Sequence, residues 1–580
     1  MLNYRFPRDE ALFLLQDVIA LPALDEVGAE MVGAIMDEAA RFGETCIAPA
    51  NVTGDQQPAT LTESGVEETP GFADIYRQFQ EAGWPSLAGD PEYGGQGLPN
   101  LLSTATSEIW QSANLAWALC PLLTQGAIDA LSHHGSEALR TTWLAKLISG
   151  EWTATMNLTE PDAGTDLAAL KTRAVPEGDH YRISGQKIFI TWGDHRMADN
   201  IVHLVLARLP DAPAGVKGIS LFLVPKFLLD EQGAPSRRND LKAVALEHKL
   251  GIHGSPTCVM SYGDEGGAIG YLVGEPHQGL ACMFTMMNAA RQAVGVQGLA
   301  LSERAYQAAR DYARERVQGT LRDGSRVTIV HHPDVRRMLL QMKAACEAMR
   351  AFAYEAAAEV DRAGAATDDK EKAAREKRVA LYTPLVKGWM TELAQEVCSL
   401  SVQVHGGMGY IEETGVAQLY RDARILPIYE GTTGVQALDL IGRKIAADGG
   451  EALNALFGDI ERSLNECGDA PEVLRTGLSD ALHALKDTVQ VLMTSNPDDP
   501  QAAAGGSVSL LMALGYLCGG WMLLRSAHQA AQPEETTPFL QMRQQVARAY
   551  AEQLLVRCSA LAQSARAGAK TLMQVDEAQF

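Results

Sequence analysis

A change of texture near residue 151 limits what this chain can fold into. From there to about residue 275, short runs rich in β-branched and aromatic residues alternate with turn-forming residues. Residues on both sides instead carry apolar side chains at helical spacing, which predicts amphipathic helices. Because strands favour β-branched and aromatic residues, we expect strands at 152–156, 180–183, 187–191, 201–207 and 219–224. The sequence therefore predicts an α+β fold, mainly α, in which a small β domain interrupts helical segments.

The 580 residues exceed what one hydrophobic core can support, so we expect several packing units. We predict an N-terminal helical domain at 1–150, a central β domain at 151–275, a helical bundle at 276–447 and a C-terminal helical extension at 448–580. The periodicity predicts helices at 26–42, 72–82, 103–134, 280–316, 332–362 and 380–404, with an exposed charged linker at 363–376. Pro384 is expected in the first turns of its helix. Turn formers at 495–500 predict a break in the C-terminal extension.

The charge and the cysteines limit the possible partners and compartments. The formal net charge is −23, which argues against nucleic acid and anionic membranes, since both require basic surface. The nine cysteines are scattered without a CxxC pair, so we expect neither a disulfide framework nor a metal site. Reduced thiols and the lack of a signal-peptide pattern at the N-terminus predict a cytoplasmic protein.

One apolar run is long enough to be either a membrane-spanning helix or a buried one. The 18 residues 507–524 carry no charge, which is close to the lower limit for a membrane-spanning helix. Gly515, Gly519 and Gly520 would let this helix pack closely against its neighbours, and no basic cluster flanks it. We therefore expect a buried helix and no transmembrane segment.

Two stretches of the β domain combine hydroxyl, apolar and aromatic side chains. The first, MNLTEPDAGTD at 156–166, leaves a predicted strand and offers backbone N–H groups and hydroxyls to a flat heteroaromatic ring. A solvated turn would have the same composition. In the second, GQKIFIT at 185–191, alternation places Phe189 and Thr191 on one face of a strand. This pair suits stacking on a ring and bonding its edge, and a cross-strand core pair explains it equally well.

Two stretches of the helical bundle are also candidates. Arg291 lies in MMNAARQAVGVQG, where a guanidinium surrounded by apolar residues needs an anionic partner. A nucleotide phosphate or a carboxylate of a neighbouring helix would meet that need. The stretch QVHGGMG at 403–409 has three glycines, which either allow a ligand to approach closely or end a helix. It is not a dinucleotide-binding loop, because that loop opens a helix.

A single carboxylate stands on a loop rich in glycine and threonine, YEGTTG at 429–434. The apolar run ILPI precedes it and the amphipathic VQALDL follows it, so Glu430 is expected to enter apolar surroundings. Desolvation raises the pKa of a carboxylic acid. A raised pKa suits a base that must be ionised at rest and still remove a proton from carbon. A helix-capping loop with an incidental surface glutamate is the alternative.

The motifs LTEPDAGTD, GQKIFIT, KLGIHGSPT, the long helix with Arg291, QVHGGMGY and RDARILPIYEGTTGVQ, in this order, resemble the acyl-CoA dehydrogenase family. The resemblance runs from about residue 90 to residue 444, and the two ends resemble the family's longer bacterial branch. It implies a helical N-terminal domain, a central β-barrel-like domain and a helical bundle, with FAD at a subunit interface. The implied reaction converts an acyl-CoA to a trans-2-enoyl-CoA in fatty acid β-oxidation, with an electron-transfer flavoprotein as acceptor.

The resemblance also assigns roles to residues. Glu430 is the base that removes a proton from the carbon next to the thioester, and a hydride leaves the next carbon for the flavin. Arg316, Gln403 and Gly407 are expected to bind the adenosine-diphosphate half of the partner subunit's FAD. The remaining FAD contacts are expected from Met156, Leu158, Thr159, Phe189, Thr191 and Thr432. Acyl-CoA contacts are expected from Thr165, Arg291 and Gly431.

The sequence departs from the family at several positions. Many relatives have an aromatic residue at the position of Met156 and tryptophan at that of Phe189. The stretch that follows Arg316 lacks an aromatic residue that is usual there. Some branches carry the base on the long helix, where this chain has Ala290, so no second carboxylate competes with Glu430.

Other functions on the same fold would require different residues. A nitroalkane-oxidising relative would have aspartate as the base, and a DNA-associated alkylation-response relative would need a basic C-terminal face. A scaffold without catalysis would not keep Glu430 together with the flavin motifs. A methylthio-propionyl thioester stays open as an alternative substrate. We expect a homodimer, because the C-terminal extension can take the place of a second dimer.

Overall fold

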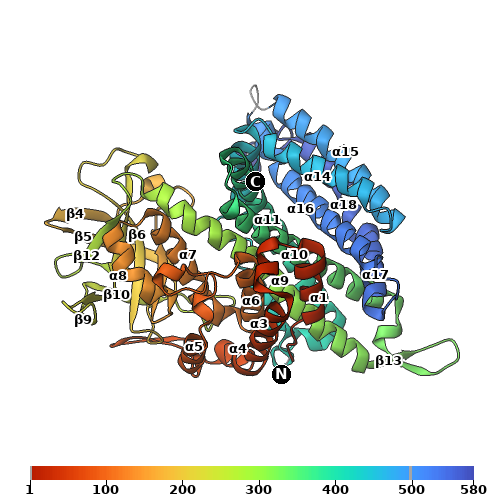
Figure 1. Ribbon diagram of the computed structural model, residues 1–580, viewed down its shortest axis with the longest axis horizontal. Helices are drawn as coiled ribbons and strands as arrows, with labels where there is room; N and C mark the ends of the chain where they lie inside the picture. Colours follow the sequence, from red (N-terminus) through yellow and green to blue (C-terminus); the bar gives the residue numbers. More distant parts are fainter. Residues whose placement is uncertain (1–2, 496–499) are drawn as a thin grey trace. The chain divides into compact units, whose positions relative to one another are not determined.

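A computed structural model describes residues 3–495 and 500–580 of the chain. Residues 496–499 of the turn predicted at 495–500 thus lie outside the described residues. The chain forms two compact units (Figure 1): Met1–Ala40, Pro99–Ser112 and Arg291–Phe580 make up the first, and Arg41–Leu98 and Ala113–Ala290 the second. The chain is mainly helical, with strands concentrated between helical segments, as the sequence predicts. The division into four domains stays a prediction.

The second unit is built on an eight-stranded sheet in which strand β4 pairs with both β5 and β6. Strands β5, β12, β7, β6 and β4 therefore form a closed ring, so the predicted barrel-like domain is confirmed. The side chains of β6 and β7 are buried almost throughout, which explains their continuous apolar runs. The strands are β3 (Trp152–Asn157), β4 (Arg173–Glu177), β5 (His180–Thr191), β6 (Asn200–Arg208), β7 (Ile219–Pro225), β10 (Leu241–Leu246), β11 (Thr257–Tyr262) and β12 (Ala268–Val273).

The two strands predicted at 180–183 and 187–191 are one strand, β5, so the expected break is wrong. Gly185 has φ +149°, and a Cβ atom there would lie 2.9 Å from the backbone of Thr172. A glycine thus lets the strand continue past a close neighbour instead of turning. Short two-stranded ladders complete the strands of this unit: β1 (Thr60–Thr62) with β2 (Gly65–Glu67), and β8 (Phe227–Leu229) with β9 (Pro235–Arg238).

Helices α4 (Ala50–Gln56), α5 (Phe72–Glu81), α7 (Leu115–His134) and α8 (Glu137–Ile148) belong to the second unit. Helices α7 and α8 pack on β3, and the rings of Trp143 and Trp152 lie 5.1 Å apart in this core. The helical zone predicted at 103–134 is confirmed, and it consists of two helices, α6 (Asn100–Ala113) and α7, that are separated at Asn114. The Asn114 side chain accepts a hydrogen bond from the Trp117 N–H and caps the new helix.

The first unit is a helical assembly around three long helices, α9 (Gly279–Glu315), α10 (Pro333–Ala365) and α11 (Asp369–His405). Helix α9 crosses from the second unit into the first at Arg291. The other elements of this assembly are α1 (Arg8–Phe13), α2 (Pro22–Val27), α3 (Ala29–Phe42), α6, α12 (Val416–Ala423), α13 (Thr433–Asp439) and the hairpin β13 (Val317–Thr320)–β14 (Arg326–Thr328).

The linker predicted at 363–376 is wrong in extent, because only three residues separate α10 from α11. The Asp368 side chain accepts hydrogen bonds from the Lys370 and Glu371 amides and caps α11 early. Arg375 then pairs with Glu371 one turn before it, which stabilises a charged helix start. Pro384 consequently lies inside α11 and not in its first turns.

The C-terminal extension consists of α14 (Glu451–Glu466), α15 (Glu472–Ser495), α16 (Pro500–Ala530), α17 (Pro538–Tyr550) and α18 (Arg557–Ala567), which lie together in Figure 1. Two helices of the described chain, α7 and α16, are long and apolar enough to cross a membrane. The fold buries 72% of the apolar window of α7 and 83% of that of α16. Gly515 and Gly519 of α16 lie so close to Trp389 that a Cβ atom would overlap it. The run 507–524 is therefore a core helix, as predicted.

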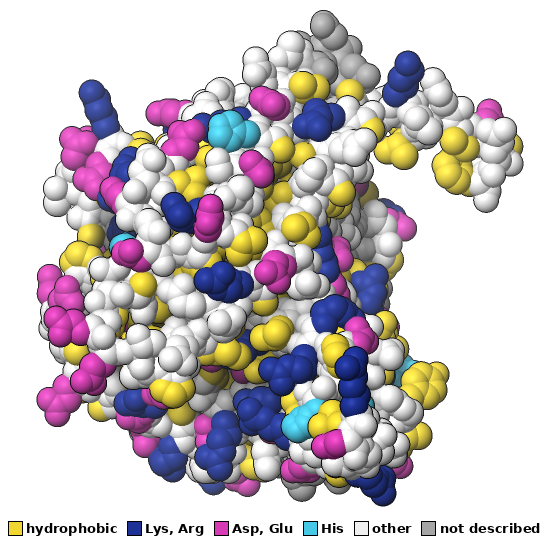
Figure 2. Space-filling view, turned by 90° about the vertical axis from the view of Figure 1, so that its right-hand side faces the viewer, with side chains coloured by type: hydrophobic (Ala, Val, Ile, Leu, Met, Phe, Trp, Pro, Cys, Tyr) yellow, Lys and Arg dark blue, Asp and Glu magenta, His cyan; other side chains and the backbone are white. Residues whose placement is uncertain are grey.

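Acidic and basic side chains both occur on the molecular face shown in Figure 2, with basic ones gathered in its lower part and acidic ones along its left edge. Many of the basic groups have a carboxylate partner, such as Lys377 with Glu451 and Arg462 with Asp459. Over the whole chain acidic residues outnumber basic ones, which gives the formal net charge of −23.

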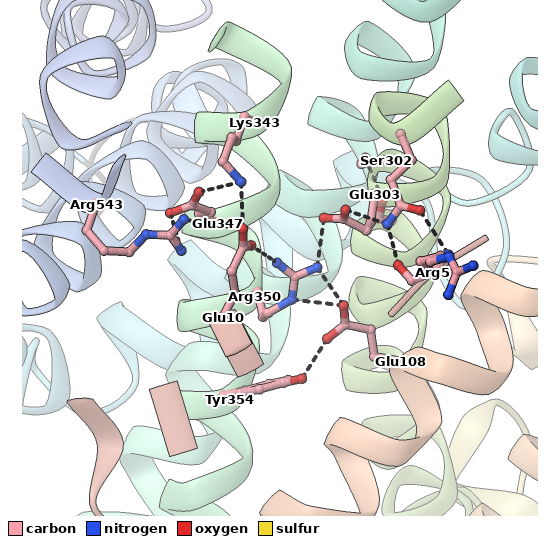
Figure 3. Close-up of polar contacts among 12 residues, drawn as sticks. Arg5, Glu10, Glu108, Ser302, Glu303, Lys343, Glu347, Arg350, Tyr354 and Arg543 are labelled. Atoms are coloured by element: carbon pink, nitrogen blue, oxygen red, sulfur yellow. Dashed lines mark hydrogen bonds and ion pairs between the residues drawn. The ribbon is translucent and has the colours of Figure 1, made fainter. Parts of the chain in front are cut away.

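A cluster of buried charges joins the N-terminal segment to the helices of the first unit (Figure 3). The fully buried Arg350 of α10 donates to Glu108 of α6 at 2.8 and 2.9 Å, to Glu303 of α9 at 2.9 Å and to Glu10 of α1 at 3.2 Å. The Tyr354 hydroxyl donates to the other Glu108 oxygen at 2.7 Å. Lys343, Glu347 and Arg543 of α17 extend the cluster through Glu10. Four helices distant in sequence thus depend on one guanidinium.

Candidate active site

The first two motifs meet at the carboxyl ends of β3 and β5. The Ile188 N–H donates to the Thr159 carbonyl at 2.9 Å, and the Lys187 ammonium donates to the Leu158 carbonyl at 2.9 Å. Lys187 also pairs with Glu160 at 2.8 Å, and both side chains are buried. The structure therefore brings the motifs at 156–166 and 185–191 into one surface of the second unit.

Glu160 and Lys187 hold this surface together, although sequence analysis gave them no role. The Glu160 carboxylate accepts from the Lys171 and Thr172 amides at 2.6 and 3.0 Å in addition to Lys187. Burial raises the pKa of Glu160, but Lys187 and these hydrogen bonds more than offset it, so the pKa is lowered. Burial lowers the pKa of Lys187 to about 8, with Glu160 opposing the shift. Their positions in the sequence could have indicated this pairing, because Glu160 lies in the first predicted flavin-binding motif and Lys187 in the second.

The surface that these contacts support is apolar and edged by hydroxyls. Phe189 is 58% exposed, which excludes the cross-strand core pair as its role. Met156, Leu158 and Thr159 of the first motif and Thr191 of the second are half-buried. An open aromatic and aliphatic wall with neighbouring hydroxyls fits a flat heteroaromatic ring such as a flavin. Thr165 is exposed in the loop that follows β3.

The alternation used to place Phe189 and Thr191 on one face is wrong in detail. The pairing of β5 with β11 shifts between Cys258 and Met260, and Phe189 has φ +59°. A bulge therefore interrupts β5 at this point and turns the Phe189 side chain outward. A bulge changes the direction of a single side chain, and the two-residue alternation of a regular strand does not show where a bulge occurs.

The loop that carries Glu430 has a left-handed backbone at two successive residues. Glu430 has φ +56° and Gly431 has φ +88°. The left-handed region costs a residue with a side chain on the order of 1–2 kcal/mol, so surrounding contacts must hold Glu430 there. Thr432 then caps α13 by accepting from the Val435 N–H at 3.3 Å. The helix-capping interpretation of this loop is thus correct for Thr432 and does not explain Glu430.

Three side chains hold the loop by its carbonyl oxygens. Gln436 of α13 donates to the carbonyls of Glu430 and Gly431 at 3.1 and 3.3 Å. Arg291 of α9 donates to the Glu430 carbonyl at 3.3 Å, and its guanidinium also lies 3.8 Å from the carboxylate of Asp439. Lys387 of α11 donates to the Gly431 carbonyl at 2.6 Å. Sequence analysis missed Lys387 and Gln436, although a lone lysine in the apolar run TPLVKGWM was a signal like that of Arg291.

These contacts leave the Glu430 carboxylate itself without a hydrogen bond among the described residues. Burial raises the pKa of Glu430 to about 7, and the positive charges of Arg291 and Lys387 oppose this shift. Burial has the opposite effect on a cation: it lowers the pKa of Arg291, and the negative charges of Asp439 and Glu430 oppose this shift. Within the described ranges the Glu430 amide donates to no protein acceptor. The loop therefore presents a carboxylate of raised pKa next to an available N–H donor.

The remaining predicted residues of the first unit are exposed. Gln403 and Gly407 lie at the end of α11 and in the turn after it, and Arg316 precedes β13. No hydrogen bond among these three is found in the part of the chain that the structure describes. Their exposure is compatible with a ligand shared with another subunit, and their roles stay predictions.

Comparison with known proteins agrees with these motifs. Four families match successive parts of the chain: acyl-CoA dehydrogenase N-terminal domain at 32–151, middle domain at 155–264 and C-terminal domain at 277–446, and acetyl-CoA dehydrogenase C-terminal like at 456–576. The chain is 47% identical over 576 residues to a 3-methylmercaptopropionyl-CoA dehydrogenase of Ruegeria pomeroyi, covering 96% of this chain and 97% of that relative.

More distant proteins share the whole architecture. The chain is 34% identical to the broad-specificity linear acyl-CoA dehydrogenase FadE5 of Mycobacterium tuberculosis over the full length of both chains. A crystal structure of an acyl-CoA dehydrogenase complexed with FAD from Bacillus anthracis has the same fold, with a TM-score of 0.76 at 21% identity, covering 94% of this chain and 89% of that one.

Proposed function

This chain belongs to the acyl-CoA dehydrogenase family, whose members are FAD-dependent oxidoreductases, and from that premise we propose that Glu430 is its catalytic base. One observation supports this most: a carboxylate of pKa about 7 on a loop whose carbonyls are fixed and whose amide is available. FAD supplies the hydride acceptor when it is bound. The proposed reaction is α,β-dehydrogenation of an acyl-CoA to the trans-2-enoyl-CoA, with electrons passed to an electron-transfer flavoprotein.

The chain's own residues account for the steps around the substrate. The Glu430 amide is proposed to donate to the thioester carbonyl, which would acidify the neighbouring carbon, and the Glu430 carboxylate is proposed to take the proton. A preorganised donor of this kind is worth about 3 kcal/mol in the transition state. Thr165 and Gly431 are proposed to contact acyl-CoA, and Arg291 to act through the Glu430 carbonyl that it binds. The wall around Phe189 is proposed to hold the flavin ring, and Thr432 a phosphate oxygen.

A methylthio-propionyl thioester is a second candidate substrate, favoured by the 47% identity to the enzyme named for it. Its acyl chain is isosteric with a pentanoyl chain in which sulfur replaces one methylene. Anaerobic flavin reduction by both thioesters, within a series of linear acyl-CoAs, separates the two possibilities. We expect reduction by at least one acyl-CoA, and a preference of about tenfold for the sulfur compound over pentanoyl-CoA would indicate a specific pocket contact.

Protein that cannot be loaded with FAD, or that no acyl-CoA reduces, would contradict the proposed function. Equal rates with pentanoyl-CoA and the sulfur compound would instead assign the enzyme to linear acyl-CoAs and fatty acid β-oxidation.

We further propose a cytoplasmic homodimer. All nine cysteines are free thiols, which suits a reducing compartment. Helices α16 and α17 pack against α10, and α16 also packs on α11, so the C-terminal extension covers a face of the long helices. Sedimentation is expected to give the mass of a dimer at micromolar concentration, and a stable tetramer would contradict this assembly.

A further inference from the structure

The ammonium of Lys387 has an environment that its hydrogen bond to the Gly431 carbonyl does not explain. Its side chain is fully buried in α11, and its ammonium donates to the Gly431 carbonyl at 2.6 Å. No ion pair involves it within the described residues. Desolvating an ammonium without a paired carboxylate costs several kcal/mol, whereas a neutral donor such as Gln436 binds the same carbonyl without that cost. The hydrogen bond alone does not require a lysine at this position, so its positive charge should have a function of its own.

The charge that Lys387 faces is that of the base. Burial lowers the pKa of Lys387 to about 8, and Glu430 is the group that opposes this shift most. Arg291 also acts on Glu430, but its guanidinium is shared with Asp439. The other charged groups around this pair come from α9, α11, α13 and the segment after α13: Arg291, Glu392, Asp439 and Arg443.

We propose that Lys387 is a positioning residue of the base: its ammonium fixes the left-handed turn at Glu430 and Gly431, and its charge keeps Glu430 ionised when ligands exclude water. This inference rests on the proposed function, in which Glu430 removes the proton. Both parts follow from one contact, because the ammonium that binds the Gly431 carbonyl is held beside the residue that precedes it. A purely structural role would require only the hydrogen bond.

The test compares Lys387→Met and Lys387→Arg with two matched controls in the FAD-loaded enzyme. Gln436→Leu removes a neutral donor from the same carbonyls. Lys226→Met removes a buried lysine of the second unit, where it pairs with Asp194. Each protein is titrated in two ways: by the infrared band of the neutral Glu430 carboxyl, identified by subtracting Glu430→Gln, and by the rate of flavin reduction against pH.

In the wild type, the rate should rise with pH through about 7, because Glu430 accepts a proton only when ionised. Without Lys387 the ionised form loses a favourable charge, so the midpoint should rise by about one pH unit and the rate at pH 7 should fall about fivefold. Lys387→Arg should restore most of the wild-type midpoint. Gln436→Leu should lower the rate at every pH with a smaller shift, and Lys226→Met should leave the midpoint in place.

An infrared midpoint that Lys387→Met leaves unchanged would overturn the inference, whatever happens to stability. The same holds if Gln436→Leu shifts the midpoint as much as Lys387→Met does. The infrared titration does not depend on the role of Glu430 in the reaction. If Lys387→Met shifts the infrared midpoint of Glu430 while Glu430→Gln stays active, the proposed base is refuted and the coupling of Glu430 to Lys387 is kept.

Discussion

Replacing Glu430 by glutamine is expected to lower the rate of flavin reduction by acyl-CoA by about 10⁴-fold, the upper part of the range for loss of a general base. The amide has the size of the carboxyl group but cannot take a proton from carbon. The carbonyl contacts of Gln436, Arg291 and Lys387 do not involve the replaced group, so the loop should keep its shape. Stopped-flow reduction under anaerobic conditions measures the rate, and spectral perturbation of the flavin measures ligand binding.

The stability of this variant provides an independent check. Burial raises the pKa of Glu430 in the folded protein above its unfolded value. The protonated form is therefore favoured by folding, and this contribution is lost as the pH rises through about 7. Above that pH, Glu430→Gln should unfold at the same temperature as the wild type or higher. Glu392→Gln changes a carboxylate that accepts from Thr433 and should cost far less activity. A variant that binds acyl-CoA and reduces the flavin at the wild-type rate would exclude Glu430 as the base.

Replacing Arg350 by methionine is expected to destabilise the first unit by about 3–5 kcal/mol. The guanidinium is fully buried and serves Glu10, Glu108 and Glu303, so its loss leaves three carboxylates without their common partner. Glu10 keeps Lys343 and Arg543 as partners. Glu108 and Glu303 have no other cationic partner among the described residues and can then be neutralised only by taking up protons. The loss of stability should accordingly be larger at pH 8 than at pH 5.

Denaturant unfolding of the FAD-loaded protein at both pH values measures this effect. Arg462→Met is the matched control, since Arg462 forms an exposed pair with Asp459 and its loss should cost about 0.5 kcal/mol or less. Equal stability of Arg350→Met and the wild type, or a pH dependence of the opposite sign, would show that the cluster does not hold α1, α6, α9 and α10 together.

Periodicity predicted most of the fold, because a buried strand or helix face imposes its repeat on the sequence. Strands β3, β5, β6 and β7, the long helix α9 and the buried α16 were predicted in this way, whereas β4 and β12 of the barrel were not. The predictions miss the places where a single residue determines the start or end of a helix or the continuity of a strand. Asn114 divides the predicted helical zone into two helices, a detail that periodicity did not show, and Asp368 starts α11 early. Gly185 lets β5 continue where a break was predicted. Helix capping and close packing of two backbone segments are contacts of individual residues, and hydrophobic periodicity does not contain this information.

The sequence by itself determined the family resemblance and, through motif order and residue type, the prediction that Glu430 and the flavin-facing positions carry the chemistry. Only the tertiary structure showed which side chains hold the Glu430 loop and which charges lie around it. Lys387 lies on α11, far before Glu430 in the chain, and Gln436 lies on α13, shortly after it. Both side chains reach the Glu430 loop because α11 and α13 pack together. Lys187 and Glu160 likewise join two motifs through a buried pair. The pKa of a base depends on burial and on charges brought in from other elements, and neither exists until the chain is folded.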